Sequence, residues 1–364
     1  MKIGIITFHT ALNYGAVLQT YALMHHLEKE GQQVEIIDYR PKFNKERFSP
    51  KPLRYFLSPK NLFSILFRNS YQIHNRKAFE DFCNNFLHLS KETYSLLNLS
   101  KSNDLYDLFV TGSDQVWNLS CTDGDDSYFL PFVSDQRKKY SYAASFGVTD
   151  LLPNHVDKVR KYLSSFDKMS VREKEGCKII SDLFHNKVSS EYVLDPTLLL
   201  TKKDWYSIAD FCKCPGKKYL LVYLMSEDMS LLKFASSYAK RNDLHIIYLT
   251  QRLFKRFSAE YIKGATPNQW LGLFLNADTI ITNSFHGTVF SLNFNKNFFV
   301  KYIPKSISNS RLKNIIDDFN LHNHLLDSST FNENSSINYE KVNPVLQERR
   351  TVSYNYIKSI INDR

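Results

Sequence analysis

The feature that most constrains the fold is an alternation of strand-like and helix-like patterns, which runs twice along the 364-residue chain. Residues 3–8 form a short apolar run, residues 16–27 repeat apolar side chains at helical spacing, and residues 34–39 form a second apolar run. Parallel strands joined in this way need a right-handed helical crossover. We therefore predict that the chain opens with a Rossmann-like βαβ unit.

The alternation continues in two blocks separated by Cys214-Pro215-Gly216, a sequence typical of a hinge. In the first block, strands are predicted at 105–111, 139–145, 168–172 and 192–194, and helices at 153–166, 173–184 and 203–212. In the second block, strands are predicted at 219–225, 245–250, 279–282 and 298–302, and helices at 231–240, 268–275 and 287–294. This α/β pattern predicts an N-terminal Rossmann-like domain over residues 1–212, a C-terminal Rossmann-like domain over residues 213–330, and a tail over residues 331–364. From Tyr339 onward, we expect the tail to form a helix that packs back across either domain.

The basic character of the chain favours anionic partners. A formal charge of +10 and a pI near 9.1 suit phosphorylated substrates, anionic lipid headgroups or nucleic acid. Basic and aromatic residues are interleaved in an insertion over residues 41–79. Two interpretations fit it: a solvated lid or helical cover, and a segment that contacts a membrane surface. No recognised nucleic-acid-binding module organises the charge, so we expect no nucleic-acid partner.

Several classes of protein are disfavoured by what the sequence lacks. It has neither a signal-like segment nor an apolar run of the roughly 18 residues that span a membrane, so we expect a cytoplasmic protein with peripheral contact at the inner face of the membrane as an alternative. Its five scattered cysteines lack the spacing of a zinc site, and reduced thiols without a bound metal are expected. The motifs of dinucleotide-binding proteins, P-loop NTPases, zinc proteases and α/β-hydrolases are absent.

Polar clusters follow the predicted strands, where open α/β sheets bind ligands and helix N-termini offer N–H groups to anions. They are Asn13-Tyr14-Gly15, residues 112–118, Arg172, and residues 282–288 with His286 in the first turn of a helix. Each also has a structural interpretation: Asn13 as an N-cap, residues 112–118 as a capped turn, Arg172 in a surface salt bridge, and His286 as a packing residue. Asn283 or Ser284 is the natural cap of the helix that holds His286.

These clusters, taken in order, resemble the bacterial polysaccharide pyruvyltransferase family. The resemblance covers roughly residues 3–320 and rests on residues 13–19, 112–117, 170–173, 195–196 and 284–287. It implies two Rossmann-like domains facing a cleft, in a GT-B-like glycosyltransferase architecture, with phosphoenolpyruvate bound in the cleft as donor. The implied product is a sugar of a cell-surface polysaccharide, or of its polyprenyl-linked oligosaccharide precursor, that carries a pyruvate ketal.

The resemblance also implies roles for individual residues. Arg172 would hold the phosphate or carboxylate of the donor, His286 would contact the same anion or shuttle a proton, and Asp114 would act as acid or base. The remaining residues expected to bind the donor are Asn13, Ser113, Asn283, Ser284, Gly287 and Arg311. No cofactor or metal is expected, because arginine, histidine and helix dipoles can stabilise a departing phosphate.

Two other functions fit the same sequence. One is a GT-B glycosyltransferase with a nucleotide-sugar donor, and the other is a non-catalytic subunit of a polysaccharide assembly complex. For the pyruvyltransferase, we expect Arg172→Ala and His286→Ala each to abolish transfer with little change in melting temperature, because both residues are expected at a cleft. The acceptor sugar and the oligomeric state are not specified by the sequence.

Overall fold

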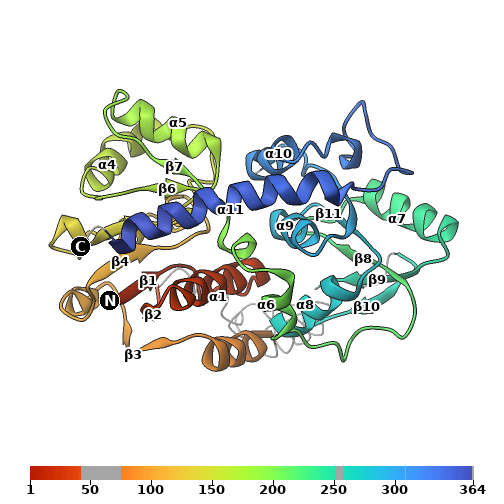
Figure 1. Cartoon of the computed structure of the whole chain (residues 1–364), viewed down its shortest axis with the longest axis horizontal. Coiled ribbons are helices and arrows are strands. Elements are labelled where there is room, and N and C mark those ends of the chain that lie inside the picture. Colours follow the sequence, from red (N-terminus) through yellow and green to blue (C-terminus); the bar gives the residue numbers. More distant parts are fainter. Residues whose placement is uncertain (42–74, 251–256, 308, 363–364) are drawn as a thin grey trace, which may run out of the picture.

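The computed structural model describes residues 1–41, 75–250, 257–307 and 309–362 (Figure 1). Most of the basic aromatic insertion predicted at 41–79 therefore lies outside the described residues. The part that is described includes a helix over residues 75–86.

The N-terminal sheet is parallel, with strand order β3-β2-β1-β4-β5. The elements of the N-terminal half are β1 (Lys2–Ile6), α1 (Tyr14–Lys29), β2 (Gln33–Tyr39), β3 (Leu89–Tyr94), β4 (Leu108–Thr111), β5 (Lys139–Ser141), α4 (Pro153–Leu163), β6 (Ser170–Val171), α5 (Lys174–Leu183), β7 (Glu191–Tyr192) and α6 (Lys202–Tyr206). Of these strands, β6 and β7 pair with each other in a separate two-stranded parallel sheet. Ile5 on the central strand pairs with Ile36 on one side and Val110 on the other. These apolar strands are buried on both faces, as expected of a parallel sheet between helices.

The C-terminal sheet repeats this topology with strand order β10-β9-β8-β11-β12. Its elements and the helices that follow are β8 (Tyr219–Tyr223), α7 (Met229–Arg241), β9 (His245–Leu249), β10 (Glu260–Ile262), α8 (Pro267–Asn276), β11 (Thr279–Thr282), α9 (Phe285–Asn293), β12 (Asn297–Val300), α10 (Asn309–Asp318) and α11 (Tyr339–Asn362). In each sheet the first strand lies at the centre and the chain crosses to both sides of it. The prediction of two Rossmann-like units is confirmed, while the domain limits at residues 212 and 330 stay predictions.

Helix α11 ties the two halves together, as Figure 1 shows by its course across both. Near its start, the Tyr339 hydroxyl donates to the Lys296 carbonyl at 2.6 Å, and near its end the Tyr356 hydroxyl donates to the Ser141 carbonyl at 2.8 Å. Between them, Arg350 Nε donates to the Leu198 carbonyl at 2.7 Å. The closing helix predicted from Tyr339 is thus present, and it contacts both sheets.

The structure corrects some predicted elements. The helix predicted at 203–212 ends at Tyr206, because the following chain bonds to the start of α8 instead: Asn268 Nδ2 donates to the Ile208 carbonyl at 2.6 Å. The edge strands β3 and β10 and the helix α10 are absent from the prediction. The predicted strand at 168–172 narrows to Ser170–Val171 and leaves Arg172 just beyond its end.

Candidate functional site

The first turn of α1 meets the first turn of α9. Asn13 caps α1, with its side-chain oxygen accepting from the Ala16 amide at 3.3 Å, so the structural interpretation of this residue is confirmed. A Cβ atom added to Gly15 would lie 2.0 Å from His286 Nδ1, which means that the helix backbone packs directly on the imidazole ring. Only glycine allows this approach. Two clusters that are remote in the sequence therefore touch.

The α9 end of this contact has the predicted local structure. Ser284 is the N-cap, with its hydroxyl accepting from the Gly287 amide at 3.2 Å, and His286 lies in the first turn. Asn283 does not cap the helix, since its Oδ1 accepts from the Met225 amide at 2.8 Å and its Nδ2 donates to the Ser226 carbonyl at 2.7 Å. The Asn283 side chain thus fixes the loop after β8, and both its amide oxygen and its amide nitrogen are hydrogen-bonded within the protein.

Arg172 is the centre of a buried ionic cluster. Its guanidinium donates to Asp195 Oδ2 at 2.8 Å, to Asp114 Oδ1 at 3.1 Å and to Glu173 Oε1 at 3.4 Å. The side chain is 0% exposed, so the surface-salt-bridge interpretation is wrong. The expectation that Arg172→Ala leaves the melting temperature unchanged loses its basis as well, because the guanidinium compensates charges in the protein interior.

Ser113 and Asp114 attach the loop after β4 to this cluster. The Ser113 hydroxyl donates to Asp195 Oδ2 at 3.1 Å and accepts from Arg172 at the same distance. Asp114 has a φ of +82°, in the region that non-glycine residues rarely adopt. Backbone strain of this kind persists only where surrounding contacts hold it, and here the carboxylate is held by Arg172 and by the Gln115 amide at 2.8 Å.

Arg311 approaches the cluster from α10. Its guanidinium and that of Arg172 lie 5.4 and 5.0 Å from the ring centroid of Phe285, within cation–π range. Arg311 Nε is 4.0 Å from Glu173 Oε1, and His286 Nε2 is 3.8 Å from Asp195 Oδ2. Both nitrogens are buried and have no hydrogen-bond partner within the described part of the chain. They are therefore hydrogen-bonding groups that the described part of the chain leaves unsatisfied.

Exposure divides the cluster into an inner and an outer side. The side chains of Glu173 and Asp195 are 4% and 1% exposed, like the fully buried Arg172. Asp114, Arg311 and His286 retain 14%, 11% and 10% exposure. A ligand that reaches the cluster meets these three first, and Arg172 lies behind them.

The environment of the cluster shifts the pKa values of its members in different directions. Burial by itself would raise the pKa of Asp114 and Asp195, but the neighbouring Arg172 and His286 outweigh it and the pKa of both carboxyls lies below its usual range. Burial lowers the pKa of His286 to about 4, so its imidazole is neutral at pH 7. Burial raises the pKa of Glu173, so its shift is opposite in direction to the shifts of Asp114 and Asp195.

Glu173, Asp195 and the neighbouring Ser145 belong to the ionic cluster, although none of them is predicted from the sequence as a site residue. The signal was present, because Glu173 and Asp195 belong to the segments on which the family resemblance rests. Their burial could not be predicted from the sequence, because a carboxylate that precedes a lysine or a proline is commonly exposed. Among the described residues, no three His, Cys, Asp or Glu side chains are arranged to hold a metal ion. The expected independence from cofactors stays a prediction.

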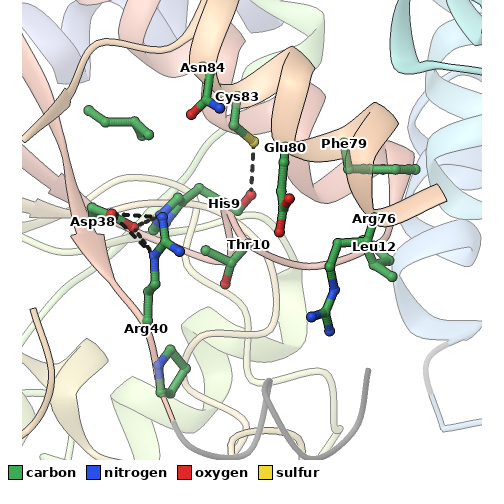
Figure 2. A pocket seen from close by; sticks show the side chains of 12 residues that line it. His9, Thr10, Leu12, Asp38, Arg40, Arg76, Phe79, Glu80, Cys83 and Asn84 are labelled. Atoms are coloured by element: carbon green, nitrogen blue, oxygen red, sulfur yellow. Dashed lines mark hydrogen bonds and ion pairs between the residues drawn. The ribbon is translucent and has the colours of Figure 1, made fainter. Parts of the chain in front are cut away.

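Two pockets flank the loop between β1 and α1. One of ≈ 250 Å³ lies between the sheets and is lined by Leu12, Asn13, Tyr14, Tyr223, Leu224, Met225, Glu227, Tyr248, Leu249 and Thr250. The other, of ≈ 340 Å³, is lined by His9, Thr10, Leu12, Asp38, Arg40, Pro41, Arg76, Phe79, Glu80, Cys83, Asn84 and Leu89 (Figure 2). Neither lining includes a residue of the ionic cluster. Both linings include Leu12, which lies three positions before Gly15 in the sequence. Within the described residues, no helix is both long and apolar enough to cross a membrane.

Comparisons with known proteins agree with this architecture. A structure of UDP-N-acetylglucosamine 2-epimerase from Rickettsia bellii aligns with a TM-score of 0.51 at 10% identity, over 99% of this chain and 95% of that one. A Listeria monocytogenes protein described as a UDP-N-acetylglucosamine 2-epimerase aligns with a TM-score of 0.51 at 9% identity, over 100% and 97%. At these identities the likeness concerns the fold alone, which is the GT-B arrangement predicted from the sequence.

Sequence comparisons identify the family. No curated protein sequence gives a significant match. The family model for polysaccharide pyruvyl transferases matches residues 13–303, which include every segment from the α1 cap to the α9 histidine. The chain therefore belongs to the polysaccharide pyruvyl transferase family.

Proposed function

We propose that this protein transfers a pyruvyl group from phosphoenolpyruvate to a sugar of a cell-surface polysaccharide or of its lipid-linked precursor, where the group forms a ketal. Family membership supports the transferase activity. The observation that carries the choice of donor is the pair of partnerless buried nitrogens, Arg311 Nε and His286 Nε2, at the N-terminal turn of α9. This combination suits a small anion that carries both a phosphate and a carboxylate.

The reaction requires only proton transfers and substitution. One sugar hydroxyl adds to C2 of phosphoenolpyruvate while C3 receives a proton and becomes a methyl group. A second hydroxyl then attacks C2, the bond to the phosphate oxygen breaks, and inorganic phosphate leaves. The two hydroxyl protons balance the one gained by C3 and the one carried by the phosphate, so no oxidant or reductant is needed.

The geometry suggests a division of labour within the cluster. Arg311 and His286 bind the anion, and Asp114, held ionised by Arg172, accepts the proton of the attacking hydroxyl. Glu173, the carboxyl of the cluster whose pKa burial raises, supplies the proton for C3. Arg172 is proposed as a positioning residue, because its donors are engaged by Asp114, Asp195 and Glu173.

The donor assignment predicts a specific loss of affinity in Arg311→Met, a variant that keeps the aliphatic stem of Arg311 against Phe285. Loss of a charged hydrogen bond worth about 1.5–3 kcal/mol should weaken phosphoenolpyruvate binding by about 10- to 150-fold. Calorimetric titration measures this, with the exposed Arg241→Met as the matched control. Wild-type binding of uridine or guanosine diphosphate-sugars without phosphoenolpyruvate binding would favour the glycosyltransferase alternative, and binding of neither donor would favour the non-catalytic one.

The acid role of Glu173 predicts two further results. Glu173→Gln should bind phosphoenolpyruvate normally but turn over about 10²–10⁴-fold more slowly, because the amide cannot release a proton to C3. In the wild type, the Ser145 hydroxyl donates to Glu173 Oε1 at 2.6 Å, and this hydrogen bond lowers the pKa of Glu173. Ser145→Ala removes it. The pKa of Glu173 should then rise further, and the alkaline limb of the pH–rate profile should move to higher pH. An unmoved alkaline limb in Ser145→Ala would exclude Glu173 as the acid.

A further inference from the structure

The pocket shown in Figure 2, which we name the His9 pocket, lies beside the β1–α1 loop and is separate from the ionic cluster. Its lining comes from this loop, from β2 and from the helix over residues 75–86. Its volume of ≈ 340 Å³ lies at the small end of the range of about 300–1,000 Å³ that is usual for small-molecule sites.

One wall of the His9 pocket is a fixed polar network. Asp38 accepts from His9 Nε2 at 3.1 Å, from Arg40 Nε at 2.9 Å and from the Thr93 hydroxyl at 2.9 Å. The His9 and Asp38 side chains are only 2% and 6% exposed. Burial tends to raise the pKa of Asp38, but the hydrogen bonds from His9 and Arg40 hold it well below its usual range. This wall is therefore built before any ligand arrives.

The opposite wall offers polar groups that the protein does not use. Glu80 and Asn84 are four positions apart on the helix over residues 75–86, so both face the pocket. Both are exposed, and neither makes a hydrogen bond or ion pair with the described parts of the protein. In Figure 2, Glu80 extends from this helix between His9 and Arg76. An acceptor and an amide are thus placed across the pocket from the guanidinium of Arg40.

The charges of the lining select the ligand class. Arg40 and Arg76 are matched in number by Asp38 and Glu80, so a strong anion would face two carboxylates and a strong cation two guanidinium groups. A neutral polyhydroxylated ring can donate to the carboxylates and accept from the arginines. Apolar contact for its C–H faces is available from Leu12, Phe79 and Leu89. The lining therefore suits a sugar and disfavours a phosphate.

The His9 pocket and the proposed reaction centre are lined or contacted by residues of one short segment, residues 12–15. Leu12 lines both the His9 pocket and the neighbouring pocket of ≈ 250 Å³, which also contains Asn13. Gly15 then packs on the His286 ring. We propose that the His9 pocket binds a neutral sugar unit of the acceptor, with Arg40, Glu80 and Asn84 contacting its hydroxyls and Asp38 holding Arg40 in place. This inference rests on the proposed function, in which transfer needs a second, sugar substrate.

The test fills the pocket without disturbing the fold. Asn84→Trp places an indole at an exposed lining position, and Asn85→Trp, on the next exposed residue, is the matched control. The probes are methyl glycosides of glucose, galactose, mannose and their N-acetylated amines, observed by saturation-transfer NMR. We expect binding of at least one glycoside to wild type and to Asn85→Trp, and its loss in Asn84→Trp. Glu80→Gln should weaken the same glycoside several-fold relative to Asp81→Asn.

Titration with phosphoenolpyruvate separates the two proposals. Unchanged donor binding in Asn84→Trp together with lost glycoside binding supports the acceptor site. Equal glycoside binding by Asn84→Trp and Asn85→Trp, or binding of no glycoside to wild type at the limit of solubility, would overturn it. Glycoside binding that depends on Asn84 in a protein that does not bind phosphoenolpyruvate would retain the sugar site and reject the proposed donor.

Discussion

Arg172→Ala should lower the free energy of unfolding by about 3–5 kcal/mol at pH 7 and abolish transfer. The reason is that the guanidinium is wholly buried and pairs with Asp114, Asp195 and Glu173, so its removal leaves carboxylates in the interior without a counter-charge. The measurement is urea-induced unfolding of wild type and variant over a range of pH.

The pH dependence identifies the cause of this loss. Arg172 depresses the pKa of Asp114 and Asp195 in the folded state, and the resulting stability is present above the unfolded value of about 3.9 and is lost as the pH falls through the lower folded value. The gap between wild type and variant should therefore be full at neutral pH and shrink in acid. The control is Arg137→Ala, which removes an exposed bidentate pair with Asp135 and should leave the unfolding midpoint unchanged. Equal midpoints for Arg172→Ala and wild type would restore the view of Arg172 as a cleft residue.

The fold was predictable where local pattern and tertiary contact agree. Central strands such as Thr279–Thr282 are short apolar runs flanked by turn residues, and the structure places this strand at the predicted residues. The edge strands Leu89–Tyr94 and Glu260–Ile262 were not predictable in this way, because the first is mostly polar and the second is only three residues long. Their strand state depends on pairing with β2 and β9.

The site was predictable in its location and less so in its internal organisation. Clusters at strand ends were expected at the ligand-binding edges of their sheets, and the family resemblance implied that the two domains face one cleft. The burial of Arg172 depends on Asp195, 23 positions later, and on Asp114, 58 positions earlier. No local pattern records such pairing, and the neighbouring Glu173 and Glu175 suggested an exposed salt bridge instead.

Gly15→Ala should inactivate the enzyme and lower its stability, although alanine is the better helix former by about 1 kcal/mol. The new Cβ would lie 2.0–2.4 Å from three ring atoms of His286, closer than carbon atoms approach. Relief requires displacement of the buried imidazole or of α1 from α9. We expect a loss of about 1–3 kcal/mol in the free energy of unfolding, typical of overpacking, and a fall of at least about 10²-fold in kcat/KM.

Two further variants test the steric origin of this effect. Gly216 has no heavy atom within 4 Å of an added Cβ and no positive φ, so Gly216→Ala should be neutral in both measurements. In the double variant Gly15→Ala/His286→Ala the clashing ring is gone. Its loss in free energy of unfolding should therefore be smaller than the sum of the losses in the two single variants. Transfer should nevertheless stay absent, because the imidazole is missing. Strict additivity of the two losses in stability would mean that α1 and α9 are not in contact in solution. Recovery of stability without activity would show that Gly15→Ala destabilises the protein through its clash with the His286 ring, and that transfer itself needs the imidazole.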